Sequence, residues 1–286
     1  MSEFKSLNRF QVYSRAAKRL LMLRTMSGRL PLYLVTEFPK SGGTWQCQML
    51  STYLGLPFPR NNEPARIEKS VLLMTQLHRP HFRNVTVAFR DGRDIMVSAY
   101  HHFLFRNKHN VEFGVRRTRR HVPCEDYHDV MGNMPKFIDY MFGWFANRSL
   151  HHSWSEFVDS WVDQNAQIVR YEDLLIDPHS HMKRALEALG QEVDDERLAA
   201  TIEQYSFKNV TGRKQGEEAK HSFARKGISG DWKNNFSLEA CEKFHSYAGK
   251  HLIKAGYETD DSWIHDQAER LAASECLSTP TEPVQS

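Results

Sequence analysis

The sequence predicts an α/β fold, a single domain whose central, mostly parallel sheet is flanked by helices. Two observations support this prediction. Short apolar runs alternate along the chain with longer segments of helical periodicity, and this alternation is typical of a parallel sheet covered on both faces. A glycine-rich turn also joins the first apolar run to a helical segment, a connection that such sheets place at the carboxyl ends of their strands.

The expected strands are the four apolar runs at residues 33–35, 71–74, 85–89 and 167–171. The expected helices cover residues 49–54, 95–103, 153–162 and 178–189, and the pair Asp177-Pro178 opens the last of them. Residues 105–135 are irregular and rich in Arg, His and Asn, which predicts a long mobile loop. From residue 270 onward Ser, Thr, Pro, Glu and Gln dominate, which predicts a disordered tail.

The composition excludes some classes of function. The chain has 286 residues, of which 40% are hydrophobic and 26% charged, as in soluble globular proteins. Its net charge of +3 is too small to indicate nucleic-acid binding. The four cysteines, Cys47, Cys124, Cys241 and Cys276, lie far apart without a C-x-x-C pair. This spacing predicts reduced thiols and a cytoplasmic location.

The sequence predicts no transmembrane segment, because no apolar run is long enough to span a bilayer. Basic residues such as Arg9 and Arg15 interrupt the N-terminal apolar stretch, so a signal peptide is not expected either. Residues 7–24 form a basic, amphipathic segment. It either makes peripheral contact with an anionic membrane or packs on the domain with its basic face in water, and we favour packing.

The most informative stretch is residues 39–45, PKSGGTW. A glycine-rich turn between a strand and a helix directs several backbone N–H groups to one point at the positive end of the helix dipole. Lys40 adds a charge and Thr44 a hydroxyl. The turn therefore predicts an anion seat in a P-loop-like nucleotide-binding core. In the Walker A loop the lysine follows the last glycine, whereas Lys40 precedes both glycines.

PKSGGTW resembles the 5′-phosphosulfate loop of the sulfotransferases that use 3′-phosphoadenosine 5′-phosphosulfate (PAPS). Residues 89–103 resemble the 3′-phosphate-binding segment of the same family, in which an arginine ends a strand and a serine follows eight residues later. Those residues are Arg90 and Ser98 here, and the planar guanidinium suits a phosphate. The alternative interpretation is that Arg93 and Asp94 simply form a solvated start of a helix.

Residues 225–234, RKGISGDWKN, resemble the family's RKG…GDWK segment, whose Arg-Lys-Gly part folds over the 3′-phosphate. Two adjacent cations and a flexible glycine suit a loop that closes on a dianion. A solvated loop is the alternative. Smaller matches are Tyr171, near the cofactor, Phe207, on the adenine side, and Trp45, facing the other side of the base. Each of these aromatic residues is also compatible with core packing.

The resemblance covers residues 33 to about 257 and implies a sulfotransferase domain at 31–260, after an amphipathic segment at 1–30 and before a helix end and disordered tail at 261–286. It implies PAPS as the cofactor and 3′-phosphoadenosine 5′-phosphate (PAP) as the product. The cofactor-binding residues that it implies are Lys40, Ser41, Gly42, Gly43, Thr44, Trp45, Arg90, Ser98, Tyr171, Ser206, Phe207, Arg225, Lys226 and Gly227.

The expected reaction is in-line transfer of the sulfuryl group to a hydroxyl of a small-molecule or lipid acceptor. Such a transfer needs positive charge at the leaving phosphate, for which Lys40 is the candidate. The resemblance implies that Ser98 holds Lys40 away until the acceptor arrives. No metal is required when a lysine and N–H groups supply the positive field. Adjacent histidines, as in the pairs at 101–102 and 151–152, point apart on a helix and predict no metal site.

The acceptor hydroxyl needs a general base, and histidine is suited to that role near neutral pH. Composition selects none of the fifteen histidines. His78, in the stretch LHRP, matches the family's THxP stretch, and the resemblance makes it the base, with His81 as the rival. Two residues that would act close to the transferred group depart from the family pattern. Gln76 replaces a lysine, and Gly43 replaces a residue that carries a hydroxyl.

A third departure is Phe157, which stands where many small-molecule enzymes of the family place an acceptor-side histidine. These changes favour an acceptor other than those of the phenol and steroid enzymes. The apolar band at 137–145 either lines an acceptor pocket or forms a core helix. Residues 233–242 resemble the family's dimer segment with Ser-Leu in place of Thr-Val, which leaves a homodimer open.

Two other functions stay open as alternatives. A catalytically silent PAP(S)-binding module would explain the departures at Gln76 and Phe157. A nucleotide-dependent phosphotransferase is disfavoured, because the Walker order is absent and no acidic strand end for Mg²⁺ accompanies the loop.

Overall fold

The computed structural model of the protein describes residues 14, 17, 21, 32–58, 71–76, 84–106, 112–219 and 225–278. The chain forms two compact units. The first, called unit 1 below, comprises Met1–Arg90 and Asn165–Lys214, and unit 2 comprises Asp91–Gln164 and Gln215–Ser286. Among the described residues, no helix is long and apolar enough to cross a membrane.

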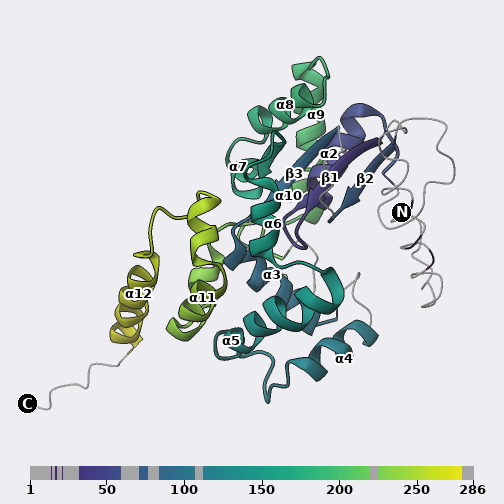
Figure 1. The fold of residues 1–286 in the computed structure, drawn as a ribbon. Helices are drawn as coiled ribbons and strands as arrows, with labels where there is room; N and C mark the ends of the chain where they lie inside the picture. Colours follow the sequence, from purple (N-terminus) through teal and green to yellow (C-terminus); the bar gives the residue numbers. More distant parts are fainter. Residues whose placement is uncertain are drawn as a thin grey trace, which may run out of the picture. The chain divides into compact units, whose positions relative to one another are not determined.

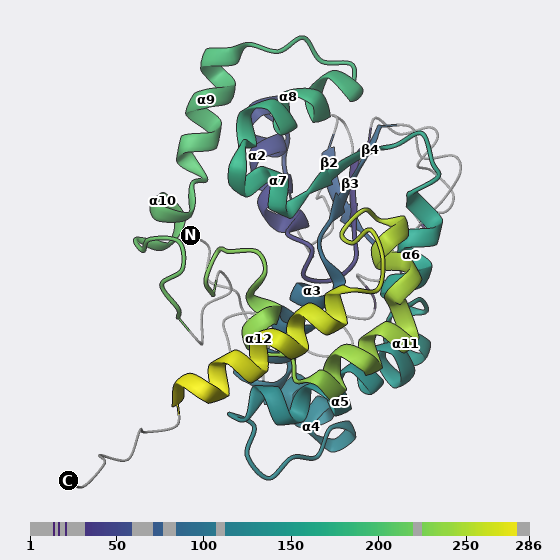
Figure 2. The same cartoon turned by 90° about the vertical axis from the view of Figure 1, so that its left-hand side faces the viewer.

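Unit 1 contains a parallel four-stranded sheet, seen in Figures 1 and 2. Its strands are β1 (Leu32–Glu37), β2 (Val71–Thr75), β3 (Val85–Phe89) and β4 (Gln167–Arg170), in the order β2-β1-β3-β4. Every neighbouring pair is parallel, with Val35 opposite both Met74 and Thr86 and Phe89 opposite Arg170. The segments that follow β1, β3 and β4 therefore begin at the same edge of the sheet. The predicted α/β class and parallel sheet are confirmed.

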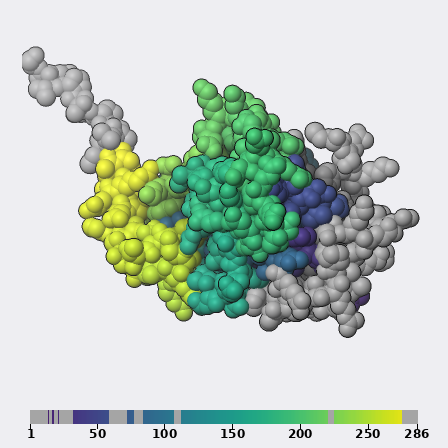
Figure 3. All heavy atoms as spheres, turned by 90° about the horizontal axis from the view of Figure 1, so that it is seen from above, coloured from purple at the N-terminus to yellow at the C-terminus, as the bar shows by residue number. Residues whose placement is uncertain are grey.

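The helices of unit 1 are α2 (Gly43–Leu54), α7 (Tyr171–Ile176), α8 (Pro178–Ala188), α9 (Asp195–Gln204) and α10 (Phe207–Thr211). α2 packs on β1 and β2, and α8 packs on β4. The core between them is aliphatic and includes Val35, Leu50, Leu72, Val169 and Leu186. The outer side of α9 is exposed and is drawn in green in Figure 3. Asp177 caps α8 and Pro178 is its first residue, as the sequence predicts.

Unit 2 is helical. Its elements are α3 (Gly92–Leu104), α4 (Glu112–His121), α5 (Val130–Tyr140), the π-helix η1 (Met141–Leu150), α6 (Trp154–Trp161), the 3₁₀-helix η2 (Asp231–Asn234), α11 (Leu238–Lys254) and α12 (Trp263–Ser278). The core is aromatic, with Trp154, Phe137, Phe236 and Phe244 fully buried. Ser153 and Glu156 form a reciprocal capping box at the start of α6.

Three predictions of local structure are wrong. The expected loop at 105–135 contains α4 and the start of α5, because Val115 and Thr118, three residues apart, are buried on one face of α4. The expected tail from residue 270 is helical as far as Ser278, since α12 is anchored by the buried side chains of Trp263 and Gln267. Tyr171 begins α7 and does not extend β4. The domain boundaries stay a prediction.

Candidate cofactor-binding site

The loop between β1 and α2 is built around two residues with left-handed backbone. Lys40 has φ 77° and Gly42 has φ 90°. A side chain at Gly42 would also collide with the ring of Tyr171, whose Cδ2 would lie 2.8 Å from an added Cβ. Gly42 is therefore required by both conformation and space. Lys40 lacks glycine's freedom, and backbone strain of this kind is concentrated at binding and catalytic sites.

A carboxylate that the sequence analysis missed holds the same loop. Glu37, the buried last residue of β1, accepts a hydrogen bond of 2.8 Å from the backbone N–H of Gly43. A Cβ at Gly43 would lie 2.6 Å from Glu37 Oε2, so a side chain there would require the Glu37 carboxylate to move. The departure at Gly43 thus coincides with the contact that Glu37 makes at this position. The signal in the sequence was an acidic residue two positions after the apolar run that predicts β1.

Two hydroxyl groups of the loop differ in their surroundings. The Ser41 side chain is buried, and within the described part of the chain its Oγ has no hydrogen-bond partner. Buried hydroxyls are normally paired, so an orphan in an anion loop points to a ligand or a water. Thr44 Oγ1 lies 3.9 Å from Met74 Sδ at the end of β2.

Arg90 and Tyr171 follow β3 and β4 and meet the loop. The guanidinium carbon of Arg90 lies 4.3 Å from the centre of the Tyr171 ring, and its Nη1 donates to the Lys40 carbonyl at 3.3 Å. Trp45 packs edge-on against Tyr171 with the ring centres 5.9 Å apart. The parallel sheet therefore brings together four residues that the sequence placed in one site, Lys40, Trp45, Arg90 and Tyr171.

The expected adenine-side residues have structural partners of their own. Ser206 caps α10 by accepting from the Asn209 N–H at 3.3 Å. The Arg213 guanidinium lies 5.3 Å from the centre of the Phe207 ring. Trp45 Nε1 donates to the carbonyl of Tyr205 at 2.8 Å, which ties the loop helix α2 to the residue before Ser206.

In unit 2, the start of α3 is buried. Arg93 is 2% exposed and Asp94 is 1% exposed, so the alternative of a solvated helix start is wrong. Arg93 pairs with Asp91 at 2.7 Å and Glu258 at 2.5 Å. Asp94 accepts from the backbone N–H groups of Gly230 at 2.7 Å and of Trp232, in η2, at 2.9 Å. Ser98, half-buried, lies one turn further along α3.

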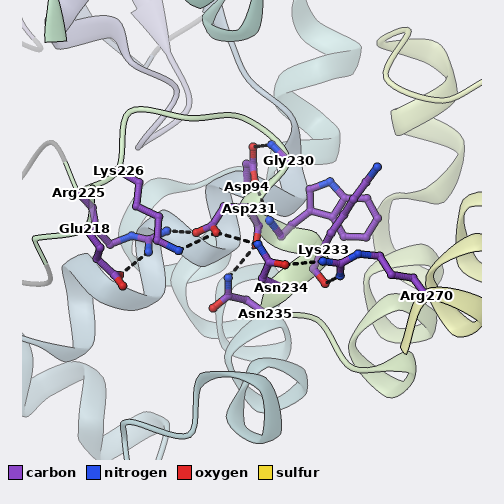
Figure 4. A network of polar contacts seen from close by, with 11 residues as sticks. Asp94, Glu218, Arg225, Lys226, Gly230, Asp231, Lys233, Asn234, Asn235 and Arg270 are labelled. Atoms are coloured by element: carbon purple, nitrogen blue, oxygen red, sulfur yellow. Dashed lines mark hydrogen bonds and ion pairs between the residues drawn. The ribbon is translucent and has the colours of Figure 1, made fainter. Parts of the chain in front are cut away.

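Asp94 thereby anchors the segment that carries the third motif, drawn in Figure 4. Arg225 donates to Glu218 at 2.6 Å and to Asp231, and Lys226 donates to Asp231 at 2.8 Å. Burial by itself raises the pKa of Asp231, but the hydrogen bonds from the two cations outweigh it and hold that pKa below its usual range. The alternative of a solvated loop is wrong for these side chains.

His101 lies on α3 and is half-buried. Burial, and secondly repulsion by Arg225, lower its pKa to about 4. The ring stacks on Phe105, with the centres 5.8 Å apart. His101 is therefore neutral at pH 7, and the paired cations and acids of the third motif, Arg225 and Lys226 with Glu218 and Asp231, act on it with opposite signs.

Several predicted residues do not enter this geometry. His78 and His81 lie outside the described residues, and so does most of the segment 7–24. Gln76, half-buried, follows β2. Phe157 is buried in the core of unit 2. Phe137 and Ile138 of the apolar band are also buried, so a core helix explains that part of the band. The described residues contain no group of three or more His, Cys, Asp or Glu placed to hold a metal ion.

Comparison with known proteins agrees with this fold. The family model of the sulfotransferase domain matches residues 60–256. Human sulfotransferase 1C2 is 24% identical over 257 residues, covering 74% of this chain and 79% of its own, and the 3-beta-hydroxysteroid sulfotransferase of Cavia porcellus is 23% identical over 236 residues, with shares of 74% and 80%.

Solved structures share the fold. Mouse sulfotransferase SULT7A1, complexed with PAP, superposes with a TM-score of 0.60 at 18% identity, covering 86% of this chain and 92% of its own. Retinol dehydratase, complexed with androsterone and PAP, gives a TM-score of 0.53 at 16% identity, with shares of 78% and 80%. Because the family model matches more than half of its length, the chain belongs to the sulfotransferase family. The prediction that it is a sulfotransferase enzyme is confirmed.

Proposed function

We propose that this enzyme transfers the sulfuryl group of PAPS to a hydroxyl of a small-molecule or lipid acceptor. The observation that carries the proposal is the loop at 40–45, where two residues adopt left-handed backbone and α2 begins at the edge of the sheet beside Arg90 and Tyr171. Relatives with PAP bound support the choice of cofactor, and the androsterone complex supports a small acceptor.

The residues present fit the 5′ end of this cofactor. The loop offers N–H groups at the start of a helix, the buried Ser41 hydroxyl has no hydrogen-bond partner among the described residues, and Lys40 supplies a cation. Three N–H groups of the loop already have acceptors, because Gly43 donates to Glu37, Ser41 to the Phe38 carbonyl at 3.1 Å and Trp45 to the Gly42 carbonyl at 2.9 Å. The phosphate would be held by the N–H groups that these bonds leave, together with the side chains of Lys40 and Ser41. We assign to Lys40 and Thr44 the stabilisation of the leaving phosphate during transfer.

For the 3′-phosphate, the proposal uses Arg90, Ser98 and the Arg225-Lys226-Gly227 segment, on the strength of their motifs. Trp45, Tyr171, Ser206 and Phe207 complete the nucleoside side. PAPS, when bound, supplies an activated sulfuryl group, so the chain's own task is to bind, orient and deprotonate. Positive charge comes from lysine, arginine and N–H groups, and the proposal includes no metal.

His78 is proposed as the general base that removes the acceptor's proton, with His81 as the rival. The alternative of a catalytically silent PAP(S)-binding module conflicts with membership of the sulfotransferase family, and Phe157, one of the two departures behind it, has a core role. We further propose a cytoplasmic location, with Cys47, Cys124 and Cys241 outside any disulfide. We also propose a homodimer, because residues 233–242 resemble the family's dimer segment.

The first test is thermal unfolding with PAP and, separately, with ATP. Saturation at a hundred times Kd contributes about 2.7 kcal/mol, which raises the Tm by about 4 °C or more. A shift with PAP that ATP does not reproduce supports the cofactor site. No shift with PAP would refute it.

The base is tested by turnover with PAPS and a panel of phenol, steroid and fatty alcohols. His78→Ala should lower the rate by about two to four orders of magnitude and leave PAP binding unchanged. His81→Ala is the matched control and should keep near-full activity. Full activity of His78→Ala would refute the assignment.

A further inference from the structure

Arg225 and Lys226 already have anionic partners within unit 2 (Figure 4). The two terminal nitrogens of Arg225 are divided between two carboxylates, with Nη1 on Glu218 at 2.6 Å and Nη2 on Asp231. The ammonium of Lys226 donates to the other oxygen of Asp231 at 2.8 Å. A phosphate that takes the guanidinium through both terminal nitrogens therefore competes with these carboxylates for the same donor nitrogens.

The two carboxylates are held very differently. Asp231 is 3% exposed, and each of its oxygens accepts from a different cation. The backbone of Asp231 is fixed as well. Asp94 accepts from the N–H groups of Gly230 and Trp232, which flank Asp231. The Asp231 carbonyl accepts from Asn235 Nδ2 at 2.7 Å. Pulling Asp231 away would leave a buried charge without its partners, which is costly.

Glu218 is the carboxylate that a phosphate can replace. Its side chain is 29% exposed, and within the described residues its carboxylate bonds only to Arg225. Once released, the carboxylate can regain hydration at the surface, so the exchange costs little. Burial raises the pKa of Glu218, but the bond from Arg225 outweighs this and lowers it, so the carboxylate is charged at neutral pH. It carries one negative charge against about two on a phosphate monoester.

We propose that Glu218 occupies the guanidinium of Arg225 in place of a phosphate monoester and is displaced when that phosphate binds, while Asp231 stays bound as a positioning residue that sets Arg225 and Lys226 at a fixed spacing. This inference rests on the proposed function, in which the phosphate is the 3′-phosphate of PAP. Glu218 then lowers the affinity of the segment for phosphate, and Asp231 raises it, although both residues carry the same charge.

The experiment measures the Kd of PAP and of adenosine 5′-monophosphate, which lacks the 3′-phosphate, by titration calorimetry in the full chain. Glu218→Gln keeps a hydrogen-bond acceptor but removes the charge, and it should tighten PAP about three- to tenfold. Asp231→Asn should weaken PAP about tenfold or more. Neither variant should change the Kd of the monophosphate, and the surface variant Glu239→Gln should change neither Kd.

Opposite signs of the two effects on PAP are the decisive result. If both variants tighten PAP equally, only net charge matters, and the inference is overturned. If Glu218→Gln weakens PAP or changes both nucleotides alike, its role is structural, which also overturns the inference. Should Asp231→Asn not fold, the sign for Glu218→Gln decides alone. If the wild type does not bind PAP, the proposed function and this inference are both refuted. If the wild type binds PAP but both variants keep its Kd, only this inference is refuted.

Discussion

Two segments of this protein are expected to hold phosphate, and they are built from different materials. The loop at 40–45 in unit 1 is a backbone seat, shaped by left-handed residues and steadied by Glu37 through an N–H group. The segment at 225–231 in unit 2 is a side-chain seat, whose two cations are paired with Asp231 and Glu218. In both segments an acidic residue holds the donors in place.

The difference shows how the two kinds of seat are specified. Backbone N–H groups are neutral, so their direction depends on local φ and ψ and on the absence of a β-carbon. Cationic side chains repel one another and have many rotamers, so their direction depends on counter-charges. The backbone seat should therefore fail when a glycine changes, and the side-chain seat should fail when Asp231, the acid that positions its cations, changes.

The largest effect is expected for Asp94→Ala, which breaks the anchor of the side-chain seat. It leaves the N–H groups of Gly230 and Trp232 buried without their acceptor, at a cost of about 3 kcal/mol in the free energy of unfolding. Urea unfolding measures this. Asp260→Ala removes a similar bond to a backbone N–H at an exposed place and should leave the midpoint near that of wild type. Equal midpoints for the two variants would contradict the anchoring role.

Gly42→Ala tests the backbone seat and should cost about 2 kcal/mol, because the added Cβ meets both an unfavourable φ and the ring of Tyr171. Gly55→Ala is the matched control, since Gly55 has φ 64° but no atom within 4 Å of an added Cβ. It should cost about 1 kcal/mol from conformation alone. PAP binding should be lost in Gly42→Ala and kept in Gly55→Ala. Retained binding in Gly42→Ala would show that the loop tolerates reshaping.

The smallest effect concerns pH and the side-chain seat. The pKa of His101 is lowered from 6.5 to about 4 by burial and then by Arg225, while Glu218 and Asp231 act against this shift. Between these pH values the unfolded chain binds a proton that the folded chain does not, so stability falls as the pH decreases from about 6.5 towards 4. We expect His101 to account for on the order of 1 kcal/mol of that loss, less than the full shift because the ring is partly open to solvent.

Midpoints of urea unfolding at pH 7 and pH 5 measure this contribution. His101→Gln should reduce the difference between the two midpoints. His265→Gln, at a ring that is 75% exposed, should leave that difference as in wild type. An unchanged difference in His101→Gln would show that the ring is already hydrated in the folded chain.

Local sequence patterns predicted most of unit 1. The β-branched run at 85–89 became β3 residue for residue, and the Asp177-Pro178 pair opened α8. The pattern failed at 105–135, where the many Arg and His residues masked two buried positions on one face of α4. Glu37 was missed for a related reason. Its role depends on Gly43, six residues away, which only the bend of the loop brings into contact with it.

The order of motifs, PKSGGTW, then the Arg90 segment, then RKG…GDWK, was enough by itself to place this chain among the sulfotransferases, because each motif carries donors for one part of a phosphate-bearing cofactor. Only the tertiary structure showed which acids control those donors. Arg93 and Asp94 look like a solvated helix start in the sequence, yet they are buried, and Asp94 anchors a segment 136 residues away from it. Pairing of buried charges depends on distance in space, and a one-dimensional pattern records only distance along the chain.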